Sequence, residues 1–201
     1  MVRIESGGST SGDYQDRIRK TPSQEGVHLR CHRVAPLVAE QRNRAHFEVL
    51  LGIRDDAGEP VPAAQFVRAA EHFGHMPAVD RWVIRSMLNW MREHRRWLRR
   101  VGGFAINLSG ASLSDPHLVE YVLELLGQSR VPPGKIVFEV TEAVAVDNMN
   151  QTQNFLRTLS EMGCRFALDG FGSGQSSYSS LERLPVDYVK IDGIFVRDIE
   201  R

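Results

Sequence analysis

The stretch from Arg165 to Asp192, RFALDGFGSGQSSYSSLERLPVDYVKID, constrains the fold more than any other part of the sequence. It begins as a short apolar strand that ends in an acid at Asp169, and a loop rich in glycine and serine follows. A brief helix is predicted from Ser179 to Leu184, before a second strand that carries Lys190. A strand, a crossover and a second strand favour parallel pairing, which is the unit of an α/β sheet or barrel. Such folds place their chemistry where the parallel strands end.

The rest of the chain repeats this alternation of strand and helix. Strands are predicted at 28–38, 46–54, 104–108 and 136–141, and helices at 15–20, 62–72, 80–101, 116–126 and from 147 or 148 to 162. This order predicts a largely parallel sheet. A TIM-like (β/α)8 barrel typically needs about 250 residues, so 201 residues can supply most of one. We expect a barrel domain at 15–201, after a disordered leader or linker at 1–14 that is rich in Gly, Ser and Thr.

The charge balance excludes some partners. Lys plus Arg and Asp plus Glu number 25 each, so the chain lacks the basic excess that a nucleic-acid polymer or an anionic membrane favours. We see neither an apolar run long enough for a bilayer nor a signal peptide. Cys31 and Cys164 are predicted to be reduced thiols in a cytoplasmic protein. The arginines of the helix at 80–101 are interpreted as a solvated face rather than a phosphate-binding patch.

Five of the predicted strands carry a polar residue near the carboxyl end, two positions after another residue on the same face. The pairs are His46 with Glu48, Ala105 with Asn107, Val137 with Glu139, Ala167 with Asp169, and Tyr188 with Lys190. The opposite faces carry large apolar residues that suit packing against helices. In a barrel, the polar set would converge inside, at the carboxyl-terminal mouth.

The predicted cluster therefore contains three carboxylates, one amide and one amine: Glu48, Glu139, Asp169, Asn107 and Lys190. These groups cannot be buried together without a counter-ion. Hard divalent cations such as Mg²⁺, Mn²⁺ or Ca²⁺ take this kind of oxygen-rich ligand set. The lysine would balance charge or act as an acid–base or transition-state contact. The alternative is a set of buried ion pairs that only stabilise the barrel, but five polar residues at matching strand ends favour a site.

Around these residues the chain resembles the EAL domain family. The matching motifs are FEVLL (47–51), INLSG (106–110), FEVTE (138–142), LDGFGSGQSS (168–177) and LPVDYVKID (184–192), and PAAQFVRAAE and VDRWVI match the segment between the second and third strands of the family. The resemblance runs from about residue 27 to 198, in order and at the right spacing. It implies a modified (β/α)8 barrel that hydrolyses the bacterial second messenger cyclic di-GMP to the linear dinucleotide with Mg²⁺ or Mn²⁺.

The resemblance also implies roles for individual residues. Glu48 would be the glutamate of the signature triplet, and Lys190 would lie beside the attacking water. Glu142 would anchor the loop at 171–177. These three residues are the catalytic candidates. The implied metal ligands are Glu48, Asn107, Glu139 and Asp169. The substrate-binding candidates are Asp80, Ser173 and Gly174. Candidate partners are cyclic di-GMP, an upstream GGDEF, PAS or receiver-type domain, and a second copy of the chain.

The chain departs from the family pattern at several positions. Gly52 stands where the family usually has an arginine that holds the nucleotide, and Arg54 is the candidate substitute. Ala35 replaces a glutamine, and Gly170 replaces the second of two paired aspartates, so one carboxylate of the second metal is lost. We therefore expect at most one Mg²⁺ or Mn²⁺. Since the chain stops at Arg201, the last two strand–helix units are expected to be absent and the barrel incomplete.

These matches and departures favour a degenerate EAL signalling module, regulatory or binding a nucleotide or protein, with little or no catalysis. Positioning and electrostatics dominate phosphoryl chemistry, so the lost metal ligand and the lost arginine should both slow hydrolysis. The alternative is an active, metal-dependent cyclic di-GMP phosphodiesterase. A third hypothesis, a different divalent-metal barrel enzyme that stabilises an enolate, rests only on the Lys-Ile-Asp sequence at 190–192.

Overall fold

The computed structural model describes residues 26–37, 45–55, 57–173 and 181–197. In chain order the elements are β1 (Val27–Val34), β2 (His46–Arg54), β3 (Pro60–Val61), α2 (Ala63–His72), α3 (Met76–Glu93), α4 (Arg95–Leu98), β4 (Gly103–Asn107), α5 (Gly110–Leu113), α6 (Leu118–Ser129), η2 (Pro133–Lys135), β5 (Ile136–Thr141), α7 (Glu142–Asp147), α8 (Met149–Glu161), β6 (Arg165–Phe171), β7 (Tyr188–Ile191) and η3 (Gly193–Phe195). The leader expected at 1–14 and the helix expected at 15–20 lie outside the described residues.

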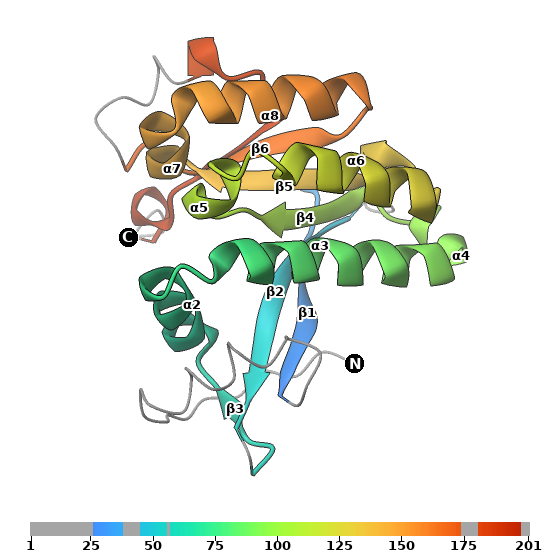
Figure 1. Cartoon of the computed structure of the whole chain (residues 1–201), viewed down its shortest axis with the longest axis vertical. Helices are drawn as coiled ribbons and strands as arrows, with labels where there is room; N and C mark the ends of the chain where they lie inside the picture. The colour runs from blue at the N-terminus through green and yellow to red at the C-terminus, as the bar shows by residue number, and fades with distance from the viewer. Residues whose placement is uncertain (1–25, 38–44, 56, 174–180, 198–201) are drawn as a thin grey trace.

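The strands form one sheet in the order β1-β2-β4-β5-β6-β7, with the two-residue β3 paired to β2. Pairing is parallel from β2 through β7, as predicted, whereas β1 and β3 are antiparallel to β2. The described strands do not close into a ring, which confirms the expected incomplete barrel. Figure 1 shows α3, α6 and α8 lying side by side along one face of the sheet.

The sheet curls strongly, as the wall of a barrel does. Although β4, β5 and β6 lie between β2 and β7 in the sheet order, side chains of β2 and β7 touch. The rings of His46 and Tyr188 are 5.6 Å apart between centroids, and Lys190 Nζ lies 3.5 Å from Glu48 Oε1. The inward faces of the parallel strands therefore enclose a common interior.

The two faces of the sheet differ as the alternation of the strands predicted. The outward residues, such as Phe104, Phe138 and Phe166, are fully buried in the main core. Phe138 packs edge-on against Phe155 of α8, at 5.4 Å between ring centroids. The inward residues form a second, small apolar cluster, with Tyr188 packed against Ala105, Val137 and Ala167. This cluster is the floor of the site described below.

The helix predictions needed correction in two places. The predicted helix at 80–101 begins earlier, at Met76, and is broken at His94, whose backbone leaves the helical region before the short α4 begins. The short helices α5 and α7, directly after β4 and β5, were not predicted. Both have side-chain N-caps, because Ser109 Oγ accepts from Ser112 N and Thr141 Oγ1 accepts from Val144 N. Of the helix predicted at 179–184, only 181–183 is described as helical.

None of the described helices combines the length and apolarity that crossing a membrane requires. Cys31 and Cys164 are both free thiols. Burial raises the pKa of Cys164 to about 12, which leaves this thiol unreactive at neutral pH.

Candidate functional site

Five strands bring a lysine, three carboxylates and an amide together, in the carboxyl-terminal half of every strand except β2, where Glu48 is the third residue. Lys190 Nζ donates to Glu139 Oε2 at 2.9 Å, and it lies 3.3 Å from Asp169 Oδ1 and 3.5 Å from Glu48 Oε1. Asn107 Nδ2 completes the cluster by donating to Glu48 Oε1 at 3.3 Å. The structure thus assembles all five predicted residues of the cluster in one place, from β2, β4, β5, β6 and β7.

Burial and charge act against each other in this cluster. Glu139 is the deepest member, with only 5% of its side chain exposed. Its pKa is raised, first by burial, while Lys190 opposes the shift and the charges of Glu48 and Asp169 add to it. Burial alone would lower the pKa of Lys190, but the hydrogen bond that Lys190 donates to Glu139 and the three carboxylate charges outweigh burial and raise the pKa. Lys190 is therefore a stable cation at neutral pH.

A β-bulge shapes the end of β6. The register between β6 and β7 shifts between Leu168 and Phe171, so Asp169 and Gly170 lie at the irregular point, where a bulge redirects side chains. Gly170 has φ +68°, a left-handed conformation that favours glycine. Ser173 closes the turn, because its Oγ donates to Gly170 O at 2.7 Å. The glycine that departs from the family pattern therefore also suits the local backbone.

Glu142 holds the loop that follows β6. It is the first residue of α7 and only 4% exposed, and its Oε2 accepts from Gly172 N at 3.2 Å. Gly172 is the first residue after β6, so this contact joins α7 to the start of the loop. Ser173 lies on the same turn, while Gly174 is outside the described residues.

Asp80 is buried at the hollow described below, which it helps to line. Its carboxylate is 4% exposed and accepts hydrogen bonds from Ser109 N, Ser109 Oγ and Ser112 Oγ at 2.9, 2.7 and 2.6 Å. Through these bonds α3 holds the segment directly after Asn107. The sequence analysis missed Ser109 and Ser112, although the serine of INLSG was a visible N-cap signal.

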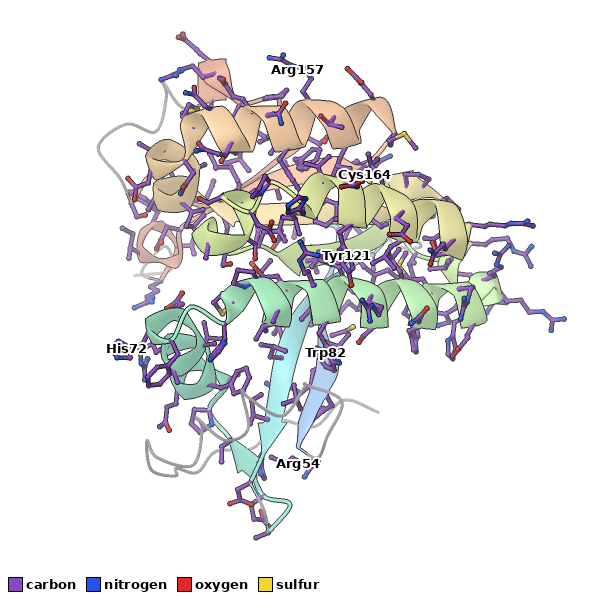
Figure 2. The ribbon with its side chains drawn as sticks, in the orientation of Figure 1. Arg54, His72, Trp82, Tyr121, Arg157 and Cys164 are labelled. Atoms are coloured by element: carbon purple, nitrogen blue, oxygen red, sulfur yellow. The ribbon has the colours of Figure 1, made fainter. Side chains whose placement is uncertain are left out.

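The structure does not bring Arg54 to the cluster. Arg54 lies six residues beyond Glu48 on β2, about 20 Å along an extended strand, and its guanidinium donates to Gly58 O at 2.6 Å. Figure 2 shows Arg54 at the far tip of the β2–β3 hairpin. Gly52 is paired with His28 across β1 and β2. A Cβ on Gly52 would meet the imidazole of His28 at 2.3–2.8 Å, so His28 fills the space above this glycine.

A hollow of about 400 Å³ opens beside Asn107, between β2, α2 and α3. Its lining is largely apolar and includes Val49, Leu51, Ala63 and Val67. Ala35, the other departure, lies at the opposite mouth of the barrel, in a separate hollow. A flat, partly apolar group held near the carboxylates would fit the hollow beside Asn107.

The chemistry of the donor set suits a hard cation, because three carboxylates and an amide oxygen converge from four strands. Within the parts of the chain that the structure describes, however, no three His, Cys, Asp or Glu side chains are gathered closely enough to hold a metal ion. The ammonium of Lys190 lies among the carboxylates and supplies the positive charge that an ion would bring.

Fold and site together define a class of protein: a barrel-like α/β domain with a mostly parallel sheet, whose strands present an acidic cluster around a lysine. The family model of the EAL domain matches residues 28–201. The chain belongs to the EAL domain family.

Two curated relatives show the same relationship. The chain is 42% identical over 156 residues to cyclic di-GMP phosphodiesterase PdeB of Shewanella oneidensis, covering 78% of this chain and 18% of PdeB. It is 35% identical over 166 residues to cyclic di-GMP phosphodiesterase PdeF of Escherichia coli, covering 83% of this chain and 22% of PdeF. The chain therefore spans about a fifth of the length of these relatives.

Among solved structures, the FimX EAL domain superposes with a TM-score of 0.86 at 30% identity, covering 96% of this chain and 76% of that one. A second structure, titled as the FimX EAL domain from Pseudomonas aeruginosa bound to c-di-GMP, gives a TM-score of 0.85 at 30% identity and covers 94% and 75%.

Proposed function

We propose that this chain is a degenerate EAL signalling module that binds cyclic di-GMP or a protein partner, with little or no hydrolysis. The observation that carries the proposal is the end of β6, where a single carboxylate, Asp169, precedes a left-handed glycine, Gly170. Glycine offers no oxygen from a side chain. One ligand of a two-metal arrangement is therefore missing, and the backbone there is shaped for the residue that is present.

Three features support cyclic di-GMP as the ligand. The FimX EAL domain, which shares the fold at 30% identity, has been solved with c-di-GMP bound. The hollow beside Asn107 supplies apolar walls next to the cluster, and base-like rings need such walls. Lys190 is one cation among three carboxylates at this site, and a divalent ion held there would supply the further positive charge that attracts a phosphate.

Glu48, Asn107, Glu139 and Asp169 are the residues that would hold one Mg²⁺ or Mn²⁺. A bound ion would lower the pKa of a coordinated water and neutralise charge on the phosphate oxygens. The residues of the chain itself orient this chemistry: Asn107 holds Glu48, Glu142 holds the loop after β6, and Lys190 keeps its proton. Since Lys190 occupies the centre of the carboxylates, the lysine and an ion compete for the same oxygens.

The second candidate function is an active cyclic di-GMP phosphodiesterase. It is favoured by the assembly of Glu48, Asn107, Glu139, Asp169 and Lys190 in one cluster and by the likeness to PdeB and PdeF. The difference between the two candidates is the rate of hydrolysis.

Both properties can be measured on one purified sample with Mn²⁺. Calorimetry would give the affinity for cyclic di-GMP, and chromatography of the products would give the turnover. We expect binding with turnover far below about 1 s⁻¹, which is ordinary for an enzyme. Turnover at or above that rate would contradict the assignment as a degenerate module. If cyclic di-GMP did not bind, the ligand of the module would be a protein partner instead.

Substitutions at position 170 sharpen the test. Gly170→Asp should raise turnover, whereas Gly170→Asn, of equal size and equal tolerance for a left-handed backbone, should not. Equal turnover in the two variants would show that the missing carboxylate is not what limits hydrolysis.

A further inference from the structure

The amino-terminal mouth of the barrel, opposite the carboxylate cluster, contains a second hollow, of about 610 Å³. Its walls come from the first residues of the parallel strands and the segments just before them: His46 of β2, Val101 before β4, Lys135 before β5, Arg165 of β6 and Tyr188 of β7. In Figure 1 this mouth lies on the side of α4, while α5 and α7 mark the carboxyl ends.

Among the described residues that line this hollow, the charged side chains all have one sign. Arg99, Lys135 and Arg165 line it together with His46, and none of the described residues that line it is acidic. The whole chain is neutral by formal charge. The excess of positive charge at this mouth therefore arises because the fold gathers basic side chains there, and not because the chain is basic. Three cations around one concave space raise the local concentration of anions.

Two of these cations are held in position. Lys135 Nζ donates to Val101 O at 2.5 Å, and Arg165 Nη1 donates to the hydroxyl of Tyr188 at 2.7 Å. The guanidinium of Arg165 has five N–H donors and uses one of them here, so it can also donate to a ligand. The ring of Tyr188 also contacts His46, at 5.6 Å between centroids.

One buried polar atom in this mouth lacks a partner. His46 Nε2 is buried and makes no hydrogen bond to any residue that the structure describes, and a buried polar atom without a partner is unfavourable. The space in front of it is kept open by Gly103, where a Cβ would lie 3.5 Å from His46 Cδ2 and 3.0 Å from Lys135 O. An imidazole nitrogen that carries a proton can donate to an oxyanion. Without the proton, the nitrogen can accept from a protonated oxygen of the ligand.

The barrel interior is thus divided by charge. In β2 and β6 a basic residue starts the inward face, His46 and Arg165, and an acidic residue follows further along it, Glu48 and Asp169; in β7 the inward residues are Tyr188 and Lys190. Ala105, Val137 and Ala167 form the apolar layer between the two mouths. The two hollows share no lining residue, so a ligand at one mouth does not contact the other.

We propose that the amino-terminal mouth is a binding site for a small oxyanion, with a phosphate group as the preferred ligand. A guanidinium fork and an ammonium are the donors that recognise phosphate most strongly, and His46 Nε2 supplies a third contact. The volume suits a free phosphate or a small phosphorylated molecule. The neutral charge of the whole chain argues against a nucleic-acid polymer.

Inorganic phosphate and pyrophosphate are the probes, titrated into the full chain at constant ionic strength with chloride as the reference anion. A ligand that binds only the folded state raises Tm as its concentration rises. We expect phosphate to raise Tm more than chloride does, and the variant Lys135→Gln/Arg165→Gln to lose at least about tenfold in affinity, as hydrogen bonds to charged groups predict. Arg157→Gln, on the exposed outer side of α8 (Figure 2), is the matched control and should bind phosphate as the unaltered chain does.

A histidine-labelled sample gives a test that needs no substitution. The ¹⁵Nε2 resonance of His46 should shift on saturation with phosphate, and excess cyclic di-GMP should not reverse the shift. Phosphate and chloride with equal effects at matched ionic strength would overturn the proposal, as would equal losses in the double variant and in Arg157→Gln. A stronger effect of pyrophosphate than of phosphate would identify a phosphorylated compound, rather than free phosphate, as the preferred ligand.

Discussion

At the scale of single residues, Lys190 is the group on which the site depends. It contacts three carboxylates that would otherwise repel one another, at 2.9–3.5 Å. Glu139, its shortest contact, has almost no access to solvent, so a neutral replacement of the lysine would leave a buried charge without its partner. Removing one member of a buried pair costs more than the pair itself contributes.

We therefore expect Lys190→Met to lower the free energy of unfolding by about 1–3 kcal/mol in the presence of a chelator, since partial exposure of the pair reduces the full cost. Mn²⁺ should stabilise this variant more than it stabilises the unaltered chain, because the competing ammonium is gone. Urea denaturation with EDTA and with Mn²⁺ would measure both effects, with Arg157→Met as the surface control. Equal stabilisation of the two proteins by Mn²⁺ would show that the lysine and the ion do not compete.

The absence of the family's arginine at position 52 is a second residue-scale feature. Because the His28 ring fills the space above Gly52, Gly52→Arg alone must displace that ring, at a cost of about 1–3 kcal/mol. We expect the single variant to be destabilised and the double variant Gly52→Arg/His28→Ala to recover stability and bind cyclic di-GMP more tightly than the unaltered chain. Calorimetry and thermal unfolding of all four proteins, His28→Ala included, form a double-mutant cycle. If the effects of Gly52→Arg and His28→Ala on stability were additive, the contact between the His28 ring and position 52 would be contradicted.

At the scale of elements, the bulge of β6 connects local backbone to function. Gly170→Ala should cost about 1–2 kcal/mol, since an alanine in the left-handed region is strained. A Cβ there would meet only ordinary contacts, the nearest at 3.7 Å, so backbone conformation rather than crowding would be the cause. Gly127→Ala in α6, where a Cβ would meet nothing within 4 Å, should instead stabilise by about 0.5–1 kcal/mol. Chemical denaturation of the two variants would compare them, and a loss at both positions would refute the conformational account.

The second element-scale feature is the anchor between α3 and the β4–α5 segment. The pKa of Asp80 is raised by burial, which its hydrogen bonds from Ser112 and Ser109 offset only in part. The folded state then holds this proton more tightly than the unfolded state. The contribution of Asp80 to stability is therefore full below the ordinary pKa near 3.8 and falls as the pH rises through the folded-state value.

Consequently, Asp80→Asn should lose the most stability relative to the unaltered chain near pH 4, and the difference should shrink toward neutral pH. Asp115→Asn is the control, and its effect on stability should depend on pH in the opposite direction, because the hydrogen bond from Arg81 lowers the pKa of Asp115. That contribution is present above pH 3.8 and is lost as the pH falls below the folded-state value. Urea denaturation across the acid range would separate the two, and slopes of the same sign would contradict the assignment.

At the scale of the whole molecule, the sheet is open. In the sheet order β1 and β7 are the outer strands, and apolar side chains near β7 are exposed, with Ile191 at 63% and Ile194 at 57%. Free strand edges with adjacent apolar surface favour association between chains.

We expect the chain of 201 residues to self-associate in a concentration-dependent way, and Ile191→Lys/Ile194→Lys to shift it toward monomer. Met162→Lys, a comparable change at an exposed methionine after α8, should leave the association unchanged. Sedimentation velocity over a range of concentrations would measure all three. A monomeric unaltered chain at every concentration would disprove the expectation.

The sequence by itself determined most of the strands and their faces, although the strand predicted at 28–38 ends at Val34 and the two-residue β3 was not predicted. β2 and β5 have the bounds that were predicted, because alternating side chains on a pleated strand leave a period of two in the sequence. The same period placed Glu48, Asn107, Glu139, Asp169 and Lys190 on inward faces, and parallel pairing brought those positions to one mouth. Short capped helices such as α5 and α7 escaped prediction, since elements of four to six residues are too short to show a helical period.

Only the tertiary structure decided which groups meet. The placement of Lys190 among three carboxylates, the His28 ring above Gly52 and the bonds from Ser109 and Ser112 to Asp80 depend on register, twist and rotamer, which periodicity does not specify. The basic mouth was invisible for the same reason: its members are distributed from His46 to Tyr188 in the chain. A contact between residues so far apart exists only once the sheet has curled and brought the strand ends together.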